Sequence, residues 1–133
     1  MSKKNQSLMH LFIPISLGEL MDKISILEIK KENMKGIKLE NVKKELDNLN
    51  SIVKIKNLDI DKNFLSNLRD VNKKLWVIED KIREKESQNK FDKEFIELAR
   101  SVYKENDKRA SIKKEINLKY NSNFIEEKSY IVY

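Results

Sequence analysis

The sequence predicts an all-α fold, a four-helix bundle that forms one domain over residues 1–133. The chain contains two glycines and one proline, which are too few for the turns of a strand-rich fold. Charged residues make up 38% of the chain, and apolar residues recur at helical spacing in four long segments. A chain of this length can bury a core without disulfides, and it has no cysteine to form them.

The start of the first helix is the best-specified point of the chain. Residues 1–7 are expected to be disordered, and an extended N-terminal arm should follow, because Pro14 fixes its own φ and disfavours helix before it. Ser16 and Glu19 then form the S-x-x-E capping box, in which each side chain accepts a hydrogen bond from a backbone N–H of the first turn. We therefore expect a helix from Leu17.

The first helix should end near residue 35, with Gly36 in the left-handed conformation just after it. Its apolar residues fall on two sides, since Ile26 and Ile29 lie roughly opposite Ile24. A helix with two apolar sides is usually central in a bundle or lies at a subunit interface, so a homodimer is predicted. Acidic and basic residues share the second side, which predicts partly buried polar groups there.

The later elements follow from the same spacing and from turn residues. Further helices are expected at residues 39–53, 62–86 and 92–120, with Asp59 or Asp61 as N-cap of the third and a turn at 87–90. The third and fourth helices should form a long antiparallel hairpin against which the first two pack. The segment 122–133 carries aromatic residues and is expected to be a docked C-terminal tail.

The fourth helix has a polar interruption in its apolar side, at Asn106 and Arg109. In an antiparallel hairpin with this turn, Arg109 lies level with Asp70 and Asn72 on the third helix. Either residue could pair with Arg109, and a partner is expected because an unpaired buried charge is strongly unfavourable. The same register places Arg100 near Glu79 and Asp80, a plausible ion pair. Two interpretations stay open: polar contacts that set the register of the helices, or a small-molecule pocket with flat aromatic walls.

The candidate ligand-binding residues combine this interruption, its flanking residues and the start of the first helix. They are Glu19, Asp22, Lys23, Trp76, Glu79, Asp80, Arg83, Tyr103, Asn106, Asp107 and Arg109.

The sequence contains two carboxylate pairs that could bind a metal and one helix start that could bind an anion. The carboxylate pairs Glu19/Asp22 and Glu94/Glu97 lie on helix faces but lack further carboxylates in register, so neither a metal nor another cofactor is predicted. An anion at the start of the first helix is a better candidate, because Gly18 allows close approach to the first-turn N–H groups. The capping box competes with it for two of these donors.

The net charge of +6 raises the possibility of nucleic-acid binding. The lysines are interleaved with acidic residues, however, which favours an ordinary solvated surface. No apolar run approaches the roughly 18 residues of a membrane span. The N-terminus lacks the pattern of a signal peptide, so a cytoplasmic protein is expected.

A series of short motifs runs along the chain; they are Pro14–Leu20, Asp22–Lys23, Ile26–Lys30, Asn41–Val42, Glu45–Leu46, Leu75–Trp76, Ile78–Asp80, Ile82–Arg83, Phe91–Asp92, Leu98–Arg100, Val102–Tyr103, Asn106–Asp107, Arg109, Lys113, Ile116–Asn117 and Glu127–Tyr130. In these motifs the chain resembles a small bacterial and phage family of unknown function, which is sometimes encoded near glycosyltransferase and surface-polysaccharide genes. The resemblance covers nearly the whole chain beyond residue 10. It implies a shared fold but no activity and no catalytic residue.

The expected function is a non-catalytic binding or accessory module, which the resemblance connects to surface-polysaccharide synthesis. Its polar centre would recognise an anionic or sugar-containing small molecule, or a protein partner. The alternative is an enzyme that acts on a phosphorylated or nucleotide sugar with the same residues. A third hypothesis, non-specific nucleic-acid binding, depends on net charge alone.

Overall fold

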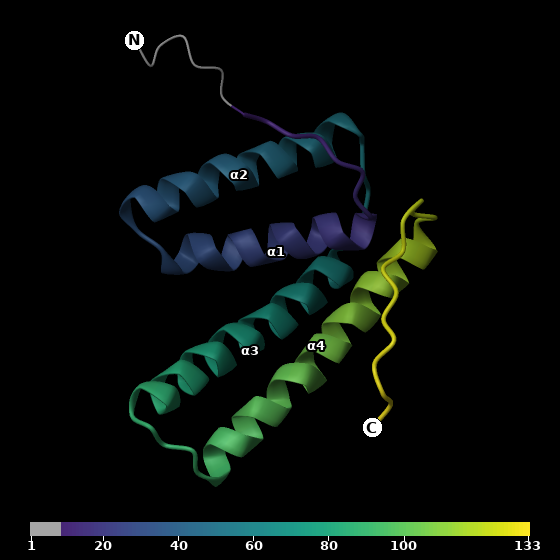
Figure 1. Ribbon diagram of the computed structural model, residues 1–133. Helices are drawn as coiled ribbons and strands as arrows, with labels where there is room; N and C mark the ends of the chain where they lie inside the picture. The colour runs from purple at the N-terminus through teal and green to yellow at the C-terminus, as the bar shows by residue number, and fades with distance from the viewer. Residues whose placement is uncertain (1–8) are drawn as a thin grey trace.

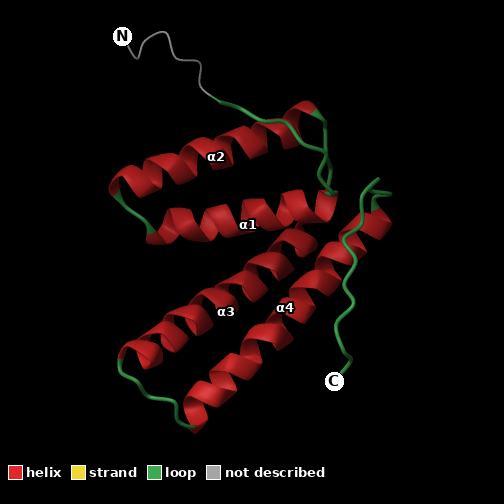
Figure 2. Cartoon of the chain, viewed as in Figure 1, coloured by secondary structure: helices red, strands yellow, loops and turns green. Residues whose placement is uncertain are grey.

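The computed structural model describes residues 9–133, and the predicted disorder of residues 1–7 falls outside this range. The fold is all-α, as predicted (Figures 1 and 2). Its four helices are α1 (Leu17–Asn33), α2 (Gly36–Ile55), α3 (Lys62–Ser87) and α4 (Lys93–Lys119). Their ends lie within three residues of the predicted ends, and residues 9–133 contain no strand.

Side chains cap three of the helices, and two of the caps, Ser16 and Asp61, lie at positions predicted from the sequence. Ser16 accepts a hydrogen bond from the Glu19 N–H at 3.1 Å, Asp61 accepts one from Asn63 and Asp92 accepts one from Phe95. Each cap satisfies an N–H that has no partner within its own helix. These local signals explain why the helix starts could be predicted.

The junction between α1 and α2 differs from the prediction. Met34 and Lys35 are extended, and Gly36, with a φ of 64°, is the first residue of α2 rather than the residue that ends α1. The left-handed conformation expected at Gly36 is therefore present, but Gly36 begins the second helix instead of following the first. Asparagines take this conformation just beyond the other three helices, at Asn57, Asn89 and Asn121.

Helix α1 is the centre of the bundle, because it packs against each of the other three helices (Figure 1). Helices α3 and α4 form the predicted antiparallel hairpin. Helix α2 packs against α1 alone, so the expectation that it would also lie on the hairpin was wrong. The two apolar sides of α1 are thus accounted for within one chain.

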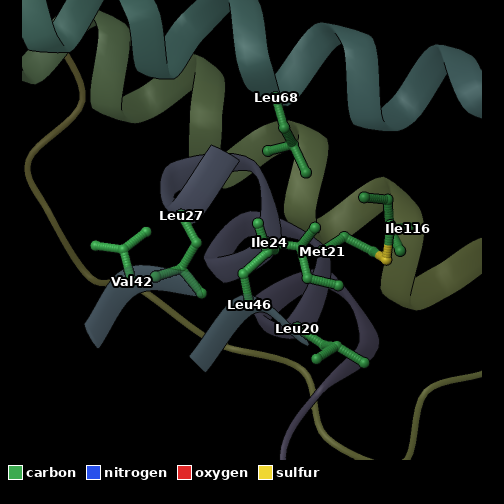
Figure 3. Packing of buried hydrophobic residues seen from close by; sticks show 8 residues of the cluster. All are labelled: Leu20, Met21, Ile24, Leu27, Val42, Leu46, Leu68 and Ile116. Carbon is green, nitrogen blue, oxygen red and sulfur yellow. The ribbon is translucent and has the colours of Figure 1, made fainter. Parts of the chain in front are cut away.

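The hydrophobic core surrounds α1, with α2 on one side and the hairpin on the other. Figure 3 shows side chains from all four helices packed around α1; they are Leu20, Met21, Ile24, Leu27, Val42, Leu46, Leu68 and Ile116. From residue 73 to residue 112, by contrast, no side chain is buried. The hairpin therefore has a packed half near α1 and a distal half near its turn.

The two chain ends behave differently. The arm from Met9 to Ile15 is extended, as predicted, but its apolar side chains are exposed and it adds to no sheet in the described part of the chain. The tail after α4 turns back along that helix, as predicted (Figure 1). Ion pairs join Glu126 to Lys113 at 3.6 Å and Glu127 to Lys114 at 3.5 Å.

Within residues 9–133, no helix is both long enough and apolar enough to pass through a membrane.

Candidate functional site

A buried carboxylate, Asp22, forms the centre of the polar cluster. It lies on α1 with 0% of its surface exposed. The Nε of Arg109, on α4, donates to its two oxygens at 2.9 and 3.0 Å, and the NH2 group of Arg109 donates as well. The Nδ2 of Asn72, on α3, donates to Asp22 Oδ1 at 2.9 Å. Three helices thus place polar groups around one carboxylate.

Ser25 completes the environment of Asn72. The Nδ2 of Asn72 also donates to Ser25 Oγ at 2.7 Å, and Ser25 Oγ donates to the Asp22 backbone carbonyl at 2.8 Å. The carboxylate and its neighbours are therefore hydrogen-bonded, as buried polar groups require. The predicted partner Asp70 is exposed and makes no such contact, whereas Asn72 reaches Arg109 through the shared carboxylate.

The guanidinium of Arg109 keeps donors for a further partner. Asp22 occupies the edge formed by Nε and NH2, and NH1 donates only a long bond of 3.4 Å to Asn106 Oδ1. A guanidinium has five N–H donors, so N–H groups remain on NH1 and NH2. The hydrogen bonds that Arg109 donates to Asp22 raise the pKa of Arg109 above its usual value. Its side chain is 27% exposed and remains accessible.

Lys113 forms a second layer of charge beside this pair. Its side chain is only 10% exposed, and its Nζ lies 2.6 Å from Glu19 Oε2, 3.6 Å from Glu126 and 3.9 Å from Asp22. Glu19 therefore pairs with Lys113, and among residues 9–133 no hydrogen bond joins its carboxylate to the Ser16 N–H. One half of the predicted capping box is present and the other half is replaced by this ion pair.

The first turn of α1 has no free N–H for an anion. The Leu17 N–H donates to Ser122 Oγ at 3.1 Å, and the Gly18 N–H donates to Asn117 Oδ1 at 2.6 Å. The next two N–H groups donate to the Oγ and the backbone carbonyl of Ser16. The N–H groups of Leu17, Gly18 and Glu19, which lack partners within the helix, therefore all have partners inside the protein, which argues against the anion site considered at this helix start.

Two cavities adjoin the cluster. The first cavity, about 680 Å³, lies between α4, the start of α1 and the tail. Its lining consists of Glu19, Val102, Tyr103, Asn106, Asp107, Arg109, Ala110, Lys113, Glu126, Lys128, Tyr130, Ile131 and Tyr133. The second cavity, about 420 Å³, lies between α1, α3 and α4. Its lining consists of Ile26, Ile29, Lys30, Asn72, Leu75, Trp76, Glu79, Asp80, Asn106 and Arg109.

Eight of the eleven candidate residues line one of these cavities or both. Glu19, Tyr103 and Asp107 line the first, Trp76, Glu79 and Asp80 line the second, and Asn106 and Arg109 line both. Asp22 is fully buried beneath Arg109 and lines neither.

Two candidates lie outside the site. Lys23 points toward α2, where its Nζ is 3.7 Å from Glu45. Arg83 is 77% exposed and pairs with Glu79 one turn away at 3.3 Å. The predicted ion pair of Arg100 with Glu79 or Asp80 is likewise not formed among the described residues, and Arg100 is exposed. The positions of Lys23, Arg83 and Arg100 could not be predicted, because helical spacing alone does not show which neighbouring helix covers a given side.

Several site residues were missed as candidates. Lys113 is buried on the inner side of α4, and its position in the apolar stripe of that helix could have identified it as a buried polar residue. Ser25 and Asn117 are fully or almost fully buried, but a single serine or asparagine in a helix gives no such signal. The tail residues Glu126 and Tyr133 could not be placed, because a segment without regular structure has no periodicity.

Tyr133 fastens the end of the tail to α4. Its hydroxyl donates to Asp107, and its ring meets Tyr103 edge to face at 5.1 Å between centroids. The hydrogen bond to Asp107 raises the pKa of Tyr133 to about 12. Because the folded pKa exceeds the ordinary value of 10.0, this contact is fully present below pH 10 and is lost as the pH rises through about 12.

An alkaline titration tests this contact. We expect the ultraviolet absorbance of tyrosinate to show a late transition near pH 12, which Asp107→Asn shifts back toward the ordinary tyrosine pKa and Tyr133→Phe removes. The exposed carboxylate of Asp47 on α2 supplies the matched control Asp47→Asn, which should leave the transition in place. A late transition that survives Tyr133→Phe would refute the assignment.

The fold and the site together define a small four-helix protein in which a buried ion pair lies beside two cavities. Comparison with known families then identifies it further. A family model described as "Family of unknown function (DUF6165)" matches residues 11–132, and the chain belongs to this family. No curated protein and no solved structure matches the chain.

Proposed function

We propose that this protein is a non-catalytic binding module that recognises a sugar-containing anion in the first cavity. The observation that carries this proposal is the position of Arg109, which is fixed by a buried carboxylate and still presents N–H donors. A surface arginine would lose side-chain entropy on binding an anion. Here Asp22 already orders the guanidinium, so less conformational entropy remains to be lost when a ligand arrives.

The lining of the first cavity supports a sugar as part of the ligand. Its charged residues balance, with the carboxylates of Glu19, Asp107 and Glu126 facing an equal number of cations. A balanced set of donors and acceptors suits a ligand with many hydroxyl groups better than a polyanion. Three tyrosines also line the cavity and offer flat apolar faces together with hydroxyl groups.

The process, the source and the location of the protein are proposed from the sequence and the family resemblance. The connection to surface-polysaccharide synthesis is inferred from the resemblance noted above, as is a bacterial or phage source. A cytoplasmic location is proposed as well, as expected from the sequence. A protein partner is the other possible ligand of this module. The homodimer stays a prediction, although α1 now buries both of its apolar sides within one chain.

Two other functions remain as alternatives. An enzyme acting on a phosphorylated or nucleotide sugar would use the same cavity, and it would be recognised by product formation. Non-specific nucleic-acid binding would be recognised by a steep loss of affinity with salt.

Thermal unfolding with glucose 1-phosphate tests the proposal. This probe has one sugar and one phosphate, and at a hundred times its Kd it should stabilise the protein by about 2.7 kcal/mol. We expect Arg109→Lys to weaken binding about ten-fold or more, because an ammonium cannot pair with Asp22 and an anion through one planar group. Tyr103→Leu, at the cavity wall, should weaken binding without touching the buried pair.

Arg100→Lys supplies the matched control, because Arg100 is exposed on the same helix and lines neither cavity. It should bind as the native protein does. The proposal fails if glucose 1-phosphate does not bind, or if Arg109→Lys and Tyr103→Leu, with native circular dichroism, bind it normally.

A further inference from the structure

The second cavity differs in chemistry from the first. Ile26, Ile29 and Leu75 form apolar walls, and Trp76 adds one large flat ring. Glu79 and Asp80 lie at its polar side and can accept hydrogen bonds. A cavity of about 420 Å³ with this lining suits a flat ring that carries polar groups at its edge.

Arg109 and Asn106 connect this cavity to the first, because both residues line both cavities. An anion bound by the remaining N–H groups of Arg109 would therefore have one cavity on each side. Lys30 adds a second cation to the lining, and no carboxylate lies within 4.0 Å of it in the part of the chain described here. Lys30 thus supplies a positive charge in addition to that of Arg109, whose own charge is balanced by Asp22.

We infer that the second cavity binds a flat heteroaromatic ring of the same ligand, whose phosphate lies at Arg109 and whose sugar occupies the first cavity. This inference depends on the proposed function and narrows it to ligands with a ring, a phosphate bridge and a sugar. Nucleoside diphosphate sugars have this composition. The ring would stack on Trp76, and the hydroxyl or amino groups beside it would donate to Glu79 and Asp80.

Trp76 is the only tryptophan of the chain, so its fluorescence reports on the second cavity alone. The experiment compares UDP-glucose with glucose 1-phosphate, which lacks the ring. We expect glucose 1-phosphate to bind with little change in tryptophan fluorescence. UDP-glucose should quench the fluorescence and bind about ten-fold or more tightly, because stacking of a base on an aromatic side chain adds to the affinity.

Substitution of the aromatic wall provides the decisive comparison. In Trp76→Leu, calorimetry should show the affinity for UDP-glucose falling to that for glucose 1-phosphate, while glucose 1-phosphate binds as before. The neighbouring residue Val77 is half-exposed and lines neither cavity, so Val77→Ala is the matched control and should change neither affinity.

The outcomes separate the inference from the proposed function. If both probes bind equally well and Trp76→Leu changes neither affinity, the ring site is refuted and the sugar-anion module stands. If UDP-glucose binds but Arg109→Lys has no effect on it, the phosphate is not at Arg109 and the bridge between cavities is refuted. If neither probe binds, the proposed function and this inference fall together.

Discussion

Asp22→Asn is expected to lower the free energy of unfolding by about 3 kcal/mol, a typical loss when one partner of a buried ion pair is removed. Asp22 has no exposed surface and accepts hydrogen bonds from both Arg109 and Asn72. An asparagine has nearly the same shape but presents an NH2 group to one of these donors. Arg109 would keep its charge in a mostly buried position but would no longer be paired with a negative charge at position 22. Urea denaturation monitored by circular dichroism measures the change.

Two further variants make the result interpretable. Asp70→Asn removes an exposed carboxylate on α3 and should change the unfolding free energy by less than about 0.5 kcal/mol. Combining Asp22→Asn with Arg109→Met removes both charges, so the double variant should be more stable than the sum of the two single losses implies. Strict additivity, or a loss from Asp22→Asn as small as that from Asp70→Asn, would contradict a coupled buried pair.

Gly18→Ala is expected to destabilise the fold by about 2–3 kcal/mol, because there is no room for a methyl group at this contact. A Cβ at this position would overlap the backbone carbonyl oxygen of Lys113 and lie 3.0 Å from Asn117 Oδ1. A backbone oxygen cannot turn aside as a side chain can, so α1 and α4 would have to separate. The hydrogen bond from the Gly18 N–H to Asn117 would lengthen as they do.

Gly36 offers the matched comparison, because it needs glycine for a different reason. Its φ of 64° disfavours a side chain, but no atom lies within 4 Å of the position that a Cβ would take. Gly36→Ala should therefore lose about 1 kcal/mol, and Gly36→Asn should lose less, since asparagine tolerates this conformation. Thermal unfolding of the three variants checks the order. A loss from Gly18→Ala no larger than that from Gly36→Ala would show that the helices separate easily.

Much of the fold could be predicted because its signals are local. The caps at Ser16 and Asp61 and the left-handed residue Gly36 each depend on a few neighbouring residues. The hairpin of α3 and α4 followed from two long apolar stripes joined by a short turn. The packing of α2 could not be derived in this way, because its one-sided stripe is compatible with several neighbours.

The partners within the site were harder to predict. The register of the hairpin related Arg109 to residues of α3, and it left out α1, which packs against both helices of the hairpin. The actual partner, Asp22, is 87 positions away in the sequence. The polar side of α1 indicated that Asp22 would be partly buried, but nothing local related it to Arg109. The contacts of the tail residues could not be predicted either, because nothing in the local sequence relates them to α4.

The distal half of the α3/α4 hairpin has a consequence for how the molecule opens. No side chain between residues 73 and 112 is buried, so the helix turns around residue 90 can fray without exposing the leucines and isoleucines of the core. Fraying that reached Trp76 and Tyr103 would still leave α1, α2 and the packed half of the hairpin folded. The parts of the two cavity walls that Trp76 and Tyr103 form would then be lost at a lower free energy than the core.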